Sequence, residues 1–246
     1  MQTIRSVVAA PKTIISRWGR ADCARIRAAL QAIPRAEQRL HAVGSNLLKT
    51  TLAGARIRAY DHYPEDDVRD YRTHSQFFFH AHPDRAGEAG HFHLFMRKAA
   101  VPAAMRRRRV PVVSPAGQDG TGMVHLGAIS LDRRGVPIRL FTTNLWVTGG
   151  DFYFAGDTLR LLERFAVTVR KPSSAVNAWV SAMVRVFHGH FALLLERRDQ
   201  VMAAWAERHP GSNVFETRRL EITSVMRIDV EQQLALMTRA VSMPGG

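Results

Sequence analysis

The feature that most constrains the fold is a pair of short segments, residues 75–82 and 90–98, in which polar and apolar side chains alternate. Both segments are rich in aromatic residues and bounded by turn formers, which is typical of β-strands, and a short loop, 83–89, joins them. Because side chains alternate across a sheet, histidines fall on one face and apolar side chains on the other. The sequence therefore predicts a β-hairpin with a histidine face.

Four histidines occupy this hairpin as two His-x-His pairs, His80 with His82 and His91 with His93. The simplest register sets His82 opposite His91 and His80 opposite His93. Opposed residues of an antiparallel pair have Cβ atoms about 4.5–5.5 Å apart, so the imidazoles converge. A metal ion needs three or four such lone pairs, and a three-imidazole set leaves a position for water or substrate. The pattern therefore predicts a metal site, with zinc or iron as the expected ion.

A second hairpin is expected from residues 123–131 and 136–144, because Asp132 and Gly135 have the chemistry of a tight turn with a left-handed glycine. One face is then expected to hold Val124, Leu126, Ala128, Ile138 and Leu140. The other is expected to hold His125, Arg139, Phe141 and Thr143. If both hairpins join one antiparallel sheet, His125 becomes a fifth candidate metal ligand.

Helical periodicity marks residues 20–33 and 35–51, with Pro34 expected to separate two helices. After residue 146 three further helical stretches are predicted. Asp157 is the expected N-cap of the first, Ser173 or Ser174 that of a long segment toward residue 206, and Asp229 that of the last.

The predicted fold class is α+β: an antiparallel sheet built from two hairpins, with one face packed against N- and C-terminal helices. We expect a single domain over residues 1–246. Residues 1–55 form its helical N-terminal extension, 72–146 its sheet, and 157–242 its mainly helical C-terminal part. The stretch 61–76 contains Pro64 and several acids, and is interpreted as an irregular connection.

The charge balance permits a nucleic-acid partner without favouring one. The formal net charge is +14, yet lysine is rare and arginine supplies nearly all of the positive charge. The densest run, residues 106–109, has no interleaved aromatic residues that would stack bases. Cys23 is the single cysteine, which rules out an intrachain disulfide and paired-thiolate zinc sites and favours the cytoplasm. No uncharged apolar stretch approaches membrane-spanning length, so no membrane association is expected.

Several side chains are candidates for catalysis or substrate binding. Glu88 lies in the loop between the histidine pairs, where it is a candidate general acid or base, or a carboxylate ligand. The candidate substrate contacts are Gln76, Arg97, Arg139, Asn144 and Trp146. Asn144 and Trp146 have an alternative interpretation, because such residues also close turns.

The runs THSQFFFHAH, EAGHFHLF, HLGAIS and LFTTNLWVTG resemble an uncharacterised bacterial family of domains of unknown function, from about Asp61 onward. The resemblance implies a bacterial, cytoplasmic protein and transfers no catalytic residue.

These observations predict a metal-dependent enzyme, a hydrolase or a non-haem iron oxygenase, that acts on a small polar or anionic substrate. Two alternatives remain open. One is a metal-free module that binds a small anion through histidine and arginine side chains. The other is a basic protein that contacts RNA or an acidic partner through its arginines.

Overall fold

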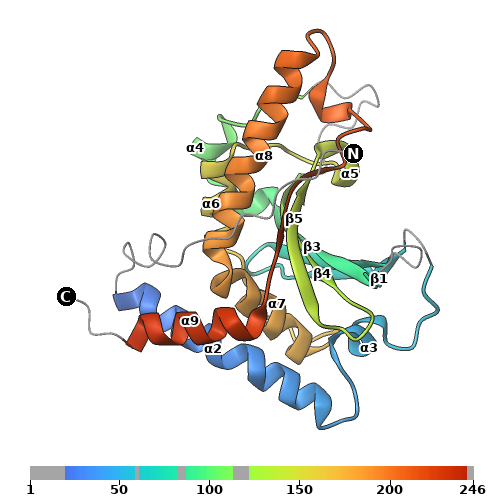
Figure 1. Ribbon diagram of the computed structural model, residues 1–246, viewed down its shortest axis with the longest axis vertical. Coiled ribbons are helices and arrows are strands. Elements are labelled where there is room, and N and C mark those ends of the chain that lie inside the picture. The colour runs from blue at the N-terminus through green and yellow to red at the C-terminus, as the bar shows by residue number, and fades with distance from the viewer. Residues whose placement is uncertain (1–19, 59–60, 82–86, 113–121, 243–246) are drawn as a thin grey trace.

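The computed structural model describes residues 20–58, 61–81, 87–112 and 122–242 (Figure 1). Within these residues one antiparallel sheet contains six strands, each beside its neighbours in chain order. The strands are β1 (His62–Arg69), β2 (Ser75–Ala81), β3 (Gly90–Arg97), β4 (Met123–Leu131), β5 (Pro137–Thr143) and β6 (Ile222–Arg227). The predicted α+β class and the two central hairpins are confirmed.

Helices from both ends of the chain share a core with the sheet. The N-terminal helices are α2 (Arg20–His41) and α3 (Leu47–Leu52), and two short ones, α4 (Ala103–Arg106) and α5 (Leu145–Thr148), lie within the sheet region. The C-terminal helices are α6 (Ala155–Glu163), α7 (Ser174–Val186), α8 (His188–Arg208) and α9 (Val230–Ser242). Two 3-10 turns, η1 (Lys98–Ala100) and η2 (Val214–Glu216), complete the described elements. Figure 1 shows α6, α7 and α8 on one side of the sheet, with α2 and α9 beside α7 at the lower left of the view.

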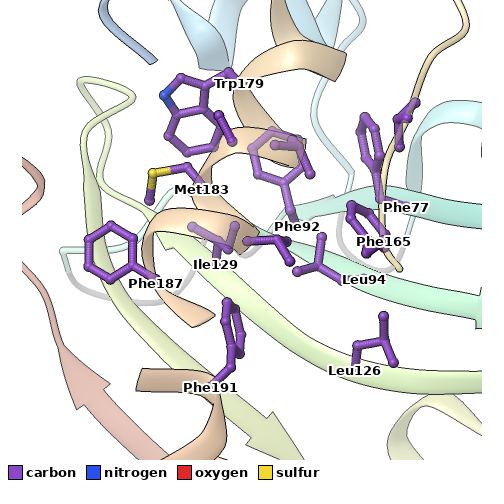
Figure 2. Close-up of a cluster of buried hydrophobic side chains, with 14 of the residues drawn as sticks. Phe77, Phe92, Leu94, Leu126, Ile129, Phe165, Trp179, Met183, Phe187 and Phe191 are labelled. Atoms are coloured by element: carbon purple, nitrogen blue, oxygen red, sulfur yellow. The ribbon is translucent and has the colours of Figure 1, made fainter. Parts of the chain in front are cut away.

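The core lies between the apolar face of the sheet and helix α7. Phe77, Phe92 and Ile129 project from neighbouring strands and are at most 1 % exposed. Figure 2 shows Trp179 and Met183 of α7 packed over these side chains. Burying one such side chain contributes about 1.5–3 kcal/mol relative to leaving it exposed, so this layer holds sheet and helices together.

Gly127 allows α8 to approach the sheet closely. A Cβ atom at this position would lie 2.7 Å from the ring of Phe191, a residue of α8. The backbone of β4 therefore forms part of the packing surface itself. The pairing of β3 with β4 is irregular beside this glycine, because Leu94 lies opposite Gly127 and Phe95 opposite His125, which leaves Leu126 of β4 as an extra residue. Ala128 consequently lies opposite His93, on the histidine face and not on the predicted apolar face.

The predicted helix break at Pro34 is wrong. Helix α2 runs through this proline and ends at His41, and the chain turns at Gly44 before α3. A proline inside a helix removes one backbone hydrogen bond. Burial of Ile33 and Ala36 beside it favours the continuous helix, since α2 packs along α7.

Two strands extend the sheet beyond the predicted hairpins. Strand β1 occupies residues interpreted as an irregular connection, because four of them, 64–67, form a bulge that hides the alternation. Strand β6 lies in the segment before α9 and pairs with β5.

The turn at Asp132 and the caps at Ser173 and Asp229 are confirmed, but the predicted N-cap at Asp157 is wrong. Helix α6 begins at Ala155, so Asp157 lies inside its first turn, where its carboxylate pairs with Arg108. Asp132 accepts hydrogen bonds from the backbone of Arg134 and Val136, which closes the β4–β5 turn. Ser173 caps α7, and Asp229 accepts from the backbone of Gln232 in α9.

No single helix among the described residues has the length and apolar character to cross a membrane. Taken together, α7 and α8 meet that length and composition, but they are bent by 68° at their junction.

Asp70 ties the β1–β2 turn to the chain before α7. Its carboxylate accepts from the backbone of Arg72 and Thr73, and from the backbone and hydroxyl of Thr168. Burial alone would raise the pKa of Asp70, but these hydrogen bonds outweigh it and lower the pKa to about 2. The ionised carboxylate therefore stabilises the folded chain.

We predict that Asp70→Asn lowers the free energy of unfolding by about 1–3 kcal/mol, because an amide cannot accept all four hydrogen bonds. The folded-state pKa lies below the unfolded value, so the stabilisation is complete above about pH 4 and is lost as pH falls toward 2. Urea unfolding from pH 7 to pH 3 measures both effects. Asp66→Asn, at an exposed position, is the control. Equal stability of the two variants would contradict this role.

Candidate metal centre

The β2–β3 hairpin brings histidines of two strands together in a register displaced by two residues from the predicted one. His80 lies opposite His91, and His93 lies opposite Phe78. The reason is that β2 ends at Ala81, which pairs with Gly90 at the start of β3. A displacement of two residues preserves the alternation, so the predicted histidine face is retained. His82 lies outside the described residues.

Gly90 makes this register sterically feasible. Its φ is +157°, and a Cβ atom there would lie 2.3 Å from the carbonyl oxygen of His80. A side chain at this position would therefore push apart the strand ends that carry His80 and His91.

His80, His91 and His93 form a three-histidine cluster. Each offers one ring nitrogen, and these three atoms lie within 4.8 Å of one another. His91 and His93 are 3 % and 2 % exposed, whereas His80 is half-buried. Two members of the cluster are thus buried, and His80 is the one that solvent partly reaches.

A continuous row of hydrogen bonds, the imidazole chain, runs through the cluster. Glu88 Oε1 lies 2.9 Å from His91 Nδ1, and His91 Nε2 lies 2.9 Å from His93 Nε2. The other nitrogen of His93, Nδ1, lies 3.0 Å from His125 Nε2. Finally, His125 Nδ1 lies 3.3 Å from the hydroxyl of Thr143. Four elements of the fold therefore contribute to one polar network.

Glu88 begins this network as an ionised carboxylate. Burial alone would raise the pKa of Glu88, but the hydrogen bond from His91, electrostatic interactions with His91 and Arg139, and a hydrogen bond from Ser130 together lower it to about 2. Arg139 is ion-paired with Glu88, and its Nε donates to Ser130 Oγ at 3.1 Å. The predicted candidates Glu88 and Arg139 thus lie beside His91 and are linked to each other.

Two rings of the imidazole chain, those of His93 and His125, are neutral near neutral pH. Burial, together with the neighbouring His91, His125, His80 and His62, lowers the pKa of His93 well below its ordinary value. Desolvation of His125, with electrostatic interactions with Arg198 and His91, lowers the pKa of His125 to about 3, although a hydrogen bond with the backbone of Gly127 partly offsets this. Near neutral pH both rings therefore carry one N–H and one lone pair each, which is the form that binds metals.

Aromatic rings enclose His93. Its ring centroid lies 5.3 Å from that of Phe78, 6.2 Å from that of Phe95 and 6.1 Å from that of Phe141. All three phenylalanines are buried. The low polarity around His93 strengthens electrostatic interactions within the cluster.

Gln76 and Arg97 are two predicted substrate contacts that lie away from the three-histidine cluster. Gln76 pairs with Phe95 and donates to Asp67 Oδ2 at 2.6 Å. The guanidinium of Arg97 lies 4.7 Å from the ring centroid of Tyr71. Phe78 and Phe95 separate these positions from the cluster, because Phe78 and His93 form the intervening register pair.

Asn144 and Trp146 use their polar groups within the fold. Asn144 is buried, accepts from the backbone of Leu145 and donates to the carbonyl of Val214. Trp146 Nε1 donates to the carbonyl of Leu220. These contacts favour the alternative interpretation, in which both residues close the turn after β5.

His62 and Asp67 at the edge of the site were not selected from the sequence. His62 stacks on Phe78 with 3.6 Å between ring centroids, and its Nδ1 lies 2.9 Å from Asp67 Oδ1. The acid-rich composition of residues 61–70 indicated such a pair, but without a predicted strand it could not be placed beside His80.

The arginine run 106–109 contacts the protein's own acceptors. Arg108 forms two hydrogen bonds with Asp157, and Arg109 forms one with Asp151. Arg106 Nε donates to the carbonyl of Val101. These contacts indicate that Arg106, Arg108 and Arg109 stabilise the fold.

A family model described as a domain of unknown function (DUF6969) matches residues 27–228. The matched region includes all six strands and the three-histidine cluster. No curated protein and no solved structure matches the chain.

We predict that Gly90→Ala lowers the free energy of unfolding by more than about 2 kcal/mol, because the methyl group overlaps the His80 carbonyl. Chemical denaturation measures the change. The control is Gly156→Ala in α6, where a Cβ atom meets nothing within 4 Å and which should be neutral or slightly stabilising. A Gly90→Ala variant as stable as this control would refute the close approach of β2 and β3.

Proposed function

Because this chain belongs to the DUF6969 family of unknown function, we propose its function from the site itself: a metal-dependent hydrolase whose ion is held by His80, His91 and His93. The substrate we propose is a small polar or anionic molecule. The observation that carries this proposal is the convergence of three ring nitrogens from two paired strands within 4.8 Å.

The contacts of His91 support metal binding. Because its Nδ1 faces the ionised carboxylate of Glu88, the proton of a neutral ring lies on Nδ1 and the lone pair on Nε2. Metal-ligating histidines commonly donate their second N–H to a carboxylate in this way, which fixes the tautomer and the ring orientation. Nε2 of His91 is also the atom nearest to His93 Nε2. The lone pair of His91 is thus directed into the cluster.

The donor set favours zinc over a non-haem iron site. Iron oxygenases commonly use two histidines and one carboxylate, whereas three histidines are typical of a catalytic zinc site with a position left for water. The carboxylate of Glu88 is engaged by His91 and Arg139, so the cluster consists of imidazoles. When bound in such a site, zinc lowers the pKa of a coordinated water and makes it a nucleophile near neutral pH.

In this proposal, residues in and around the cluster orient a ligand, bind the substrate or mark its entrance. Glu88 orients His91 and, because its carboxylate is ionised and hydrogen-bonded, contributes negative charge instead of donating a proton. Arg139 has a side chain 32 % exposed and lies next to this pair, where its guanidinium can hold an anionic group of a substrate. His80 lies at the exposed side of the cluster, which gives the direction from which a small molecule would enter.

We predict that purified protein without a polyhistidine tag binds about one zinc ion per chain. His93→Ala should bind at least tenfold more weakly, because it removes the central donor. Isothermal titration calorimetry, with elemental analysis after dialysis, measures both values. His41→Ala, at an exposed position on α2, is the control. Equal zinc affinity of the parent and the His93 variant would contradict the site, and saturable phosphate binding without zinc uptake would instead favour an anion-binding module.

Glu88→Gln should weaken zinc binding about 10–100-fold, because an amide orients His91 less well than a carboxylate does. With zinc bound, the Glu88→Gln protein should also hydrolyse 4-nitrophenyl acetate more slowly than the parent protein does. Circular dichroism and thermal unfolding show whether the variant remains folded. Full zinc affinity in a folded Glu88→Gln protein would disprove the orienting role of Glu88.

A further inference from the structure

We propose that metal binding reverses the direction of the hydrogen bonds between His93, His125 and Thr143, and that His125 is therefore a positioning residue for the ligand His93. This inference rests on the proposed metal site. It adds a role for two residues, His125 and Thr143, that do not belong to the three-histidine cluster.

One end of the imidazole chain has a fixed direction. The carboxylate of Glu88 is ion-paired with Arg139 and accepts hydrogen bonds, so His91 donates to it from Nδ1. Because Arg139 already balances the charge of Glu88, we take His91 as a neutral ring, and its Nε2 is then an acceptor, whether its partner is an N–H or a metal ion. The donor-to-acceptor direction of the other hydrogen bonds in the imidazole chain consequently depends on whether a proton or a metal ion lies between His91 Nε2 and His93 Nε2.

Without a metal, one set of tautomers satisfies the four side-chain contacts of the imidazole chain. His93 donates from Nε2 to His91 Nε2 across 2.9 Å. Nδ1 of His93 is then an acceptor, and His125 donates to it from Nε2 across 3.0 Å. Nδ1 of His125 in turn accepts from the hydroxyl of Thr143 at 3.3 Å. In this state the donors of the chain all point toward Glu88.

A metal ion at His93 Nε2 requires the opposite set. The ion needs the lone pair of Nε2, so the proton of His93 must lie on Nδ1 and be donated to His125 Nε2. His125 then carries its proton on Nδ1 and donates to Thr143. The number of protons on each ring is unchanged, since each neutral ring moves its N–H from one nitrogen to the other.

The two residues beyond His93 are suited to this reversal. A neutral imidazole presents one donor and one acceptor in either tautomer, and a hydroxyl can donate or accept by rotation. Thr143 is 6 % exposed, so the end of the chain is largely shielded from competing water. An apolar residue at position 125 would leave Nδ1 of buried His93 without this partner in both states.

Imidazole ¹⁵N chemical shifts test the reversal directly. In metal-free protein at pH 7, His93 and His125 should both show the Nε2–H tautomer. After addition of one equivalent of zinc, both should show the Nδ1–H tautomer, and His91 should keep Nδ1–H throughout. Zinc binding without a change of tautomer in His125 would overturn this inference and leave the proposed function intact. Absence of zinc binding, or the Nδ1–H tautomer of His93 or His125 in metal-free protein, would overturn the inference as well.

Substitutions at position 125 separate positioning from packing. His125→Gln keeps a group that can donate or accept near the Nε2 position, so its zinc affinity should remain within about threefold of the parent. His125→Leu lacks such a group and should bind zinc about 10–100-fold more weakly. His41→Leu is the control for replacing an exposed histidine. Equal zinc affinities of folded Gln and Leu variants, established by circular dichroism, would contradict the positioning role.

Discussion

The antiparallel pairing of β2 with β3 is the constraint on which the rest of the structure depends. It places Phe77 and Phe92 on the face that packs against α7, and His91 and His93 on the opposite face. The same backbone hydrogen bonds therefore build the hydrophobic core and the polar network. A change of register by one residue would exchange the two faces and lose both.

Burying polar groups on the histidine face costs free energy, and hydrogen bonds within the site offset this cost. A buried carboxylate and several buried imidazoles lose hydration, which is expensive unless each group finds a partner. Glu88 is compensated by His91 and Arg139, and His93 by His91 and His125. A network in which every member depends on its neighbours is sensitive to single substitutions, and it also holds the rings in fixed orientations.

The sequence was sufficient for features that depend on alternation, and insufficient for those that depend on distant packing. Two hairpins were predicted from a period of two residues and local turn chemistry. The same period predicted that His80, His91 and His93 share one face and that His125 joins it. The exact register could not be predicted, because it depends on where β2 ends. Likewise, the bulge of β1 conceals the strand that carries His62, and burial against α7 carries α2 through Pro34.

X-ray absorption spectroscopy of zinc-loaded protein tests the central claim most directly, because it reports the donors around the ion. The account predicts three imidazole nitrogens at about 2.0–2.1 Å with one further light-atom donor. It also predicts two imidazoles when His80 is replaced by alanine. A zinc ion surrounded by water oxygens alone, or the same three imidazoles in the His80→Ala variant, would contradict it.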